Sequence, residues 1–311
     1  MICETIKRAH SSVYVKIFIL NNPKILETLR EKVLENVYVS ILCQKLLETF
    51  NFPKCSNLSL TKFVSRSGVK AHKKLLLTDR RYCLFSTANF SDTNQKDVNL
   101  TVCATSSQLH YALNLSRPTV CPIGGSIVRY YPIGRTHCDG SNIICNILTR
   151  ACKSIQLGMH ILSHPEVIKL LLKLKHSGIR VTVILDPKAL QQPELPESQR
   201  RLMQKLDMQI WNGEGMLHCK FCLIDKKIAI VSSANWTILG LTKNQEDLLV
   251  LEDLNKEHKE QLLTFWNNIQ SNTIPLSRYE ANNSNLVLTE KSSDCEASTS
   301  EETSSSISKR K

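Results

Sequence analysis

The sequence predicts an α/β protein built from two repeats, each a parallel or mixed sheet flanked by helices. Three observations lead to this prediction. The chain matches itself, each copy alternates strand and helix patterns, and each copy reaches the same motif, H-x-K-x4-D. With 311 residues, of which 42% are hydrophobic, the chain is long enough to bury the core of two such repeats.

The internal repeat is clearest where residues 8–23 align without gaps on residues 150–165. In both copies the end of a helix leads into an apolar strand, and a proline then begins the next helix, where its fixed φ is favourable. A second strand follows, so each copy holds a strand–helix–strand unit. The elements expected are helices at 23–32 and 165–175 and strands at 37–43 and 179–185.

The domain boundaries follow from this alignment. We expect the first repeat over residues 1–117, the second over 118–275 and a disordered tail over 276–311. The second repeat has an additional strand at 126–133, before its helix at about 141–153, whereas the first repeat begins inside the equivalent helix and so lacks its first strand. Ser, Thr, Asn and Glu dominate the tail, a composition that cannot bury a core.

The two motifs have identical spacing. They read His72-Lys-Lys74-Leu-Leu-Leu-Thr-Asp79, then Ser86-Thr87-Ala-Asn89 after six residues, and His218-Cys-Lys220-Phe-Cys-Leu-Ile-Asp225, then Ser232-Ser233-Ala-Asn235 after six residues. In an extended segment the histidine and the lysine two positions later face the same side, so each motif points both into one pocket. Asp79 and Asp225 fall on the opposite face and are expected to be structural.

These residue types suit a phosphate group. Lysine places positive charge on the non-bridging oxygens, and Asn, Ser and Thr add neutral donors. Imidazole can attack phosphorus or transfer protons near neutral pH. Displacement at phosphorus needs one group that attacks and another that protonates the leaving oxygen, so two facing histidines predict a phosphodiesterase with a covalent phosphohistidine. A single such histidine would as readily be a core residue, but repetition at matched positions favours a site.

The doubled motif resembles the signature of the phospholipase D superfamily, of the soluble, bacterial phospholipase D-like and endonuclease-like type, over residues 1–275. The resemblance implies two repeats related by a pseudo-twofold axis, one shared active site and catalysis without a metal. It implies His72 as the nucleophile and His218 as the general acid. The phosphate ligands that it implies are Lys74, Lys220, Asn89 and Asn235, with Thr87 and Ser233.

The first copy departs from the pattern of the second. Glu246 resembles the family position whose carboxylate bonds a histidine ring. The first copy has Lys96 at the place we match to it, so His72 is expected to lack an orienting carboxylate unless Asp97 replaces it. Together with the missing strand, this departure leaves open a degenerate site with low activity.

The cysteines suggest neither a disulfide scaffold nor a metal site. Twelve in 311 residues are expected as reduced thiols. Cys219 and Cys222, beside His218, form a C-x-x-C spacing that zinc or redox sites use. On a strand, however, the two face opposite ways, and no second cysteine pair has matching spacing, so we predict no metal and no cofactor.

A net charge of +12, not contributed by residues 276–311, predicts a partner rich in phosphate: a phospholipid or anionic membrane surface, or a nucleic acid. No stable protein partner is inferred. The sequence contains neither an apolar run of 18 residues nor an apolar signal-peptide core at its start, so the expected location is cytoplasmic or peripheral to a membrane.

Three functions remain open at this point. The favoured one is hydrolysis of phospholipid head groups, from a phosphatidylcholine-type substrate to phosphatidate, since the resemblance covers two motifs in one chain without membrane helices. The alternatives are a metal-independent endonuclease acting on DNA or RNA and a catalytically degenerate protein that binds phosphate surfaces. An aromatic content of 6% gives little sign of a platform for stacking bases.

Overall fold

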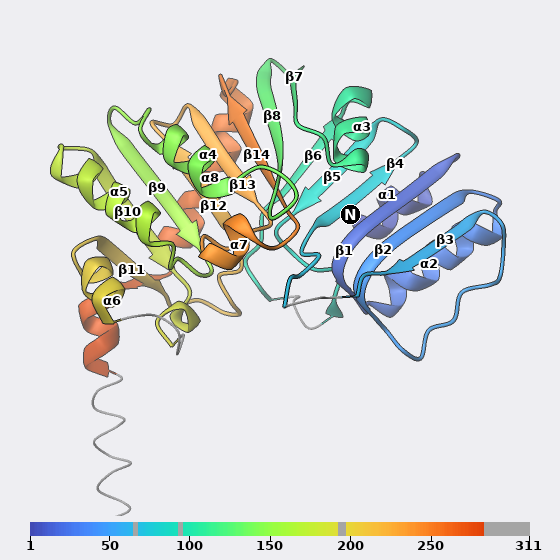
Figure 1. Ribbon diagram of the computed structural model, residues 1–311, viewed down its shortest axis with the longest axis horizontal. Helices are drawn as coiled ribbons and strands as arrows, with labels where there is room; N and C mark the ends of the chain where they lie inside the picture. Colours follow the sequence, from blue (N-terminus) through green and yellow to red (C-terminus); the bar gives the residue numbers. More distant parts are fainter. Residues whose placement is uncertain (65–67, 93–95, 192–196, 283–311) are drawn as a thin grey trace, which may run out of the picture.

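The computed structural model describes residues 1–64, 68–92, 96–191 and 197–282, and it has two mixed sheets with helices packed against them (Figure 1). The first sheet has the strand order β3-β2-β1-β4-β5-β6. Its elements are α1 (Ile2–Lys7), β1 (Ser12–Leu20), α2 (Pro23–Leu34), β2 (Tyr38–Leu46), β3 (Leu58–Lys62), β4 (Lys74–Thr78), β5 (Tyr82–Ser86), β6 (Thr101–Thr105) and α3 (Ser107–Leu115).

The second sheet has the order β15-β11-β10-β9-β12-β13-β14-β8-β7. Its elements are β7 (Thr119–Ile123), β8 (Ser126–Ile133), α4 (Gly140–Leu148), β9 (Ser154–Met159), α5 (Pro165–His176), β10 (Arg180–Leu185), a 3-10 helix (Pro187–Ala189), α6 (Glu197–Gln204), β11 (Asp207–Trp211), β12 (Lys220–Ile224), β13 (Ile228–Ser232), α7 (Ile238–Thr242), β14 (Glu246–Glu252), α8 (Lys256–Gln270) and β15 (Thr273–Pro275).

The central parts of the two sheets are copies of each other, which confirms the predicted fold class. In the first half β1 pairs in parallel with β2 and antiparallel with β4; in the second half β9 pairs in the same way with β10 and β12. The helices begin at the predicted prolines, Pro23 and Pro165, and the Asn22 side chain caps the first of them by accepting a bond from the Ile25 N–H at 3.0 Å.

The sheets differ at one edge. β14 pairs with β8, and β8 pairs with β7, whereas β6, the counterpart of β14, lies at the edge of the first sheet. β8 has the bounds expected from the sequence, and β7 is a strand that we did not predict. The two additional strands of the second half therefore extend the sheet at the place where the first half stops.

The apolar motif strands are buried on both faces, because one face meets the helices of its own half and the other meets the opposite half. Leu75 and Leu77 of β4 pack with Phe221 and Leu223 of β12 in a cluster that includes residues of α3 and α8. Leu76, which points the other way, packs under α2. Burial on both faces accounts for the uninterrupted apolar runs after the two motif lysines.

The C-terminal part of the chain corrects one boundary. Residues 276–282 are helical, and Leu276 is buried in the core of the second half, so the disorder expected from residue 276 does not begin there. Residues 283–311, on which the rest of that prediction falls, lie outside the described residues. In the described ranges we find no helix with the length and hydropathy that crossing a bilayer requires.

Candidate active site

Each histidine motif is joined to the segment that follows the other motif. The residue before His72, Ala71, forms a parallel bridge with Gln245, and the His72 N–H donates to the Gln245 carbonyl at 2.9 Å. The pseudo-twofold counterpart joins Leu217 to Val98, and the His218 N–H donates to the Val98 carbonyl at 3.0 Å. The two motifs thus meet at the junction between the sheets, and one site is built from both halves.

A carboxylate from the second half orients His72. Its Nδ1 lies 3.0 Å from Oε2 of Glu246 and 2.9 Å from Oε1, and the Glu246 side chain is almost fully buried. The Ser233 hydroxyl donates to Glu246 Oε2 at 2.6 Å and holds the carboxylate in place. The expectation that His72 lacks a carboxylate is therefore wrong, because its partner comes from 174 residues further along the chain.

The residues that we matched to this role in the first half lie elsewhere. Lys96 is exposed and pairs with Glu214, and Asp97 accepts a bond from the Met216 N–H at 3.0 Å. The true counterpart of Glu246 is Asn99, whose Oδ1 lies 3.1 Å from His218 Nδ1. Sequence reasoning missed Asn99 because the similarity of residues 94–97 to residues 244–247 displaced the alignment by three positions.

A relay of hydrogen bonds determines which way the Asn99 amide points. The Leu100 N–H donates to the Thr87 hydroxyl at 3.0 Å, and that hydroxyl donates to Asn99 Oδ1 at 3.0 Å. Oδ1 is therefore the atom that faces His218, and it accepts a bond from the Nδ1–H. The Thr87 and Ser233 hydroxyls donate to Asn99 and Glu246 and so orient the two histidine partners, and their binding of phosphate stays a prediction.

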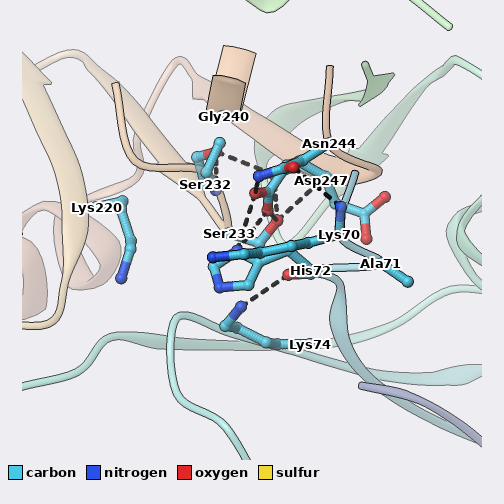
Figure 2. A network of polar contacts seen from close by, with 12 residues as sticks. Lys70, Ala71, His72, Lys74, Lys220, Ser232, Ser233, Gly240, Asn244 and Asp247 are labelled. Carbon is cyan, nitrogen blue, oxygen red and sulfur yellow. Dashed lines mark hydrogen bonds and ion pairs between the residues drawn. The ribbon is translucent and has the colours of Figure 1, made fainter. Parts of the chain in front are cut away.

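The two motif lysines form the positive part of the pocket. Lys74 and Lys220 are fully buried, and each ammonium donates to the carbonyl of its own histidine, at 2.7 and 2.6 Å. Both lysines act on the pKa of His72, and Figure 2 shows His72 with Lys74 and, further to the left, Lys220. Burial lowers the pKa of Lys74 to about 8, although Glu246 opposes the change, and burial and Lys74 hold the pKa of Lys220 well below its ordinary value.

Both histidines are neutral in the free site. Burial lowers the pKa of His72 to about 4 against the opposing effect of Glu246, and burial, Lys220 and His160 lower the pKa of His218 further. Since each Nδ1 is held by Glu246 or Asn99, Nε2 is the atom left to meet a substrate. The amide oxygens of Asn89 and Asn235 are buried without a hydrogen-bond partner among the described residues.

The motif aspartates lie at the turns that follow β4 and β12. Both have positive φ, 51° for Asp79 and 52° for Asp225, and each accepts bonds from three consecutive backbone N–H groups at the start of β1 or β9. Burial would raise their pKa values, but these bonds outweigh it and hold them below the ordinary range. Each aspartate therefore fixes its turn to the start of the neighbouring strand, which is a structural role.

Two rings lie beside the histidines of the site, and sequence reasoning had missed both. The Phe18 ring centroid lies 5.1 Å from that of His72, and the His160 ring centroid lies 5.0 Å from that of His218. The alignment of residues 8–23 on 150–165 places Phe18 on His160 and could have identified the pair.

Among the described residues, no group of three His, Cys, Asp or Glu side chains is arranged to hold a metal. Cys219 and Cys222 point to different cores, one shared by the halves and one confined to the second half. Burial raises the pKa of Cys219 to about 12 and that of Cys222 further, so both remain thiols at neutral pH.

The chain matches the family model described as "Cardiolipin synthase, PLD-like domain" over residues 2–114 and 144–267. It is 31% identical to the mitochondrial cardiolipin hydrolase of Mus musculus over 125 residues, 39% of this chain and 55% of that protein. It is 31% identical to the phospholipase D of Rickettsia conorii over 130 residues, 41% of this chain and 62% of that protein. The chain spans about half the length of the curated relatives it matches.

The fold is also found in a solved structure. The phosphatidylserine synthase of Haemophilus influenzae superposes with a TM-score of 0.70 and 15% identity, over 88% of this chain and 84% of that one. The superposition therefore extends over both repeats.

Proposed function

Because this chain belongs to the phospholipase D-like family, we propose that it is a phosphodiesterase that hydrolyses phospholipid head groups through a covalent intermediate on His72. One observation carries the proposal. Two buried lysines and two histidines with different partners converge on one pocket, which suits a phosphodiester anion and separates an attacking group from a protonating group. The relatives named cardiolipin hydrolase and phospholipase D support a lipid as the substrate.

In the first step, the lone pair of His72 Nε2 attacks phosphorus. The bond from phosphorus to the head-group oxygen breaks, and that oxygen takes a proton from Nε2 of His218. Binding of the phosphodiester anion beside His218 raises the pKa of its imidazole, so the general acid acquires its proton as substrate enters. Lys74, Lys220 and the amide N–H groups of the two motif asparagines hold the non-bridging oxygens.

In the second step, the neutral His218 accepts a proton from water as the water oxygen attacks phosphorus. The phosphorus–nitrogen bond breaks, and its electron pair returns to Nε2 of His72. The product is phosphatidate. Glu246 holds the Nδ1–H of His72 through both steps, so that the positive charge that forms on the ring during attack lies against a carboxylate.

The proposal is tested with vesicles of phosphatidylcholine and an anionic lipid, labelled in the head group and incubated in EDTA. We expect the wild-type protein to release label and His218→Gln to lose about 10²- to 10⁴-fold of the rate, because the leaving oxygen has no proton donor. His176→Gln, a change at an exposed histidine, is the matched control and should keep full activity.

The same preparation is given labelled DNA and RNA in EDTA. Cleavage of nucleic acid without release of label from vesicles would replace the proposal by a metal-independent endonuclease. Salt-sensitive binding without cleavage of either substrate would leave a protein that only binds phosphate surfaces.

Glu246→Gln tests the orientation of the nucleophile. The neutral amide cannot stabilise the imidazolium that forms during attack, so we expect kcat/KM for head-group release to fall by about 10- to 100-fold. Glu214→Gln, at the exposed partner of Lys96, is the matched control. Equal rates for the two variants would mean that the contact between Glu246 and His72 does not serve catalysis.

A further inference from the structure

The two halves of the pocket are alike in lysine and asparagine but differ in the ring that lies beside each histidine. Phe18 packs against His72, whereas His160 packs against His218, with ring centroids 5.1 and 5.0 Å apart. The two rings occupy matched positions of the repeat: Phe18 lies near the end of β1, and His160 directly follows β9. The His72 side of the site therefore has an apolar ring beside it, and the His218 side has a polar ring.

The position of His160 is tightly determined. It follows the last residue of β9, and its N–H donates to the Cys219 carbonyl at 3.1 Å, inside the second motif. The side chain of Asn235 lies beside its ring and raises the imidazole pKa through a side-chain hydrogen-bond contact, although this contact is not a hydrogen bond of ordinary geometry. Burial, then Lys220 and Lys188, lower its pKa to about 3, so the imidazole is neutral with one N–H donor.

The two ring nitrogens of His160 are buried without a hydrogen bond of ordinary geometry to any described residue. A buried polar atom without a partner costs stability, whereas a phenyl ring such as that of Phe18 would fill the same space without this cost. The cost is removed when a ligand supplies the partner.

The direction of the reaction decides which ligand atom His160 meets. In an in-line displacement the attacking group and the leaving oxygen lie on opposite sides of phosphorus. Attack by His72 therefore places the leaving oxygen on the side of His218, and this is the side on which His160 lies. His72, by contrast, has the apolar Phe18 ring beside it.

We propose that His160 is a third histidine of the active site, which binds the departing head-group oxygen by donating a ring N–H to it, and so makes the reaction selective for poor, alkoxide-like leaving groups. This inference rests on the proposed function. No proton is transferred at His160: the leaving oxygen takes its proton from His218, and His160 stabilises the negative charge that develops as the phosphorus–oxygen bond breaks.

The test compares two substrates that differ only in the leaving group, phosphatidylcholine and phosphatidyl-p-nitrophenol, in EDTA. His160→Phe, which copies the ring of the first half, should lower kcat for phosphatidylcholine by about 10- to 100-fold, the effect of losing one donor to a developing charge. It should leave kcat for the p-nitrophenyl ester within about threefold, because p-nitrophenolate leaves without such help. His160→Gln, which retains an N–H donor, should recover most of the loss.

Equal loss on both substrates would show that His160 only supports the fold, and no loss on either would show that it does not meet the leaving oxygen. His176→Phe, the same replacement at an exposed position, is the matched control and should behave as wild type on both substrates.

A second measurement separates this inference from the proposed function. Orthophosphate places one of its oxygens where the leaving oxygen would lie, so its affinity reports the contact without turnover. By calorimetry we expect His160→Phe to bind orthophosphate about tenfold more weakly than wild type and His176→Phe. If the wild type cleaved neither lipid, the proposed function would fail, and this affinity would still decide whether His160 donates to a phosphate oxygen. Unchanged affinity would overturn the inference.

Discussion

His72→Ala is expected to lower the rate of head-group release by about 10⁴-fold or more and to abolish covalent labelling of the protein. In the proposed mechanism, attack on phosphorus depends on one atom, Nε2 of His72, because Nδ1 is held by Glu246 and His218 is assigned to the leaving group. The measurement is to quench the reaction with labelled phospholipid in EDTA and to count label on the protein, which is lost on acid treatment if it is a phosphohistidine.

The general-acid variant serves as the positive control for trapping. His218→Gln cannot activate water in the second step, but a p-nitrophenyl leaving group allows the first step to proceed. Label from the phosphatidyl part of phosphatidyl-p-nitrophenol should therefore accumulate on His218→Gln and not on His72→Ala. Label that persists in His72→Ala would assign the nucleophile to another residue and reverse the roles of the two motifs.

Lys73→Met is expected to lower the free energy of unfolding by about 3–5 kcal/mol, because it leaves a buried carboxylate without its counter-charge. Lys73 Nζ lies 2.5 Å from Asp247 Oδ1, with the two side chains 6% and 0% exposed, and the pair joins the halves directly behind the active site. The Tyr130 hydroxyl donates to the same carboxylate oxygen at 2.6 Å. Urea unfolding followed by circular dichroism measures the loss.

The pseudo-twofold counterpart of this pair supplies the control, because the chain places apolar Cys219 and Leu100 there. Converting the polar cluster to the apolar type, by Lys73→Met with Asp247→Leu and Tyr130→Phe, removes the charge and its partners together. The triple variant should recover most of the stability that Lys73→Met loses. A single Lys73→Met as stable as wild type would show that Asp247 does not depend on its counter-charge.

Both predictions depend on the segment of the second half that forms hydrogen bonds with the motif of the first half. The bridge of Ala71 to Gln245 brings Glu246 to His72 and, one residue on, Asp247 to Lys73. The stability of the junction and the orientation of the nucleophile therefore share one short stretch of backbone. Catalytic and stability effects of variants at this junction are expected to be non-additive.

The fold class could be predicted from the sequence alone. The repeat of residues 8–23 at 150–165, the prolines that begin two helices and the apolar motif strands are local patterns, and each local preference agrees with the final fold. The spacing of two residues also predicted that the histidine and lysine of each motif share one site, because residues two apart in an extended segment face the same side. The aspartates are structural as expected, but they lie in the turns after β4 and β12 and not on the opposite face of a strand.

Only the tertiary structure decided which partner each histidine receives. Glu246 lies 174 residues from His72 in sequence, and Asn99 lies 119 residues from His218. Such contacts depend on how two sheets dock, and no local pattern encodes the docking. Matching the copies by short-range similarity gave Lys96 a place that belongs to Asn99. His160 could not be recognised for the same reason. A histidine after an apolar strand is not a distinctive pattern, and only packing places its ring beside His218 and leaves its nitrogens without a bond of ordinary geometry.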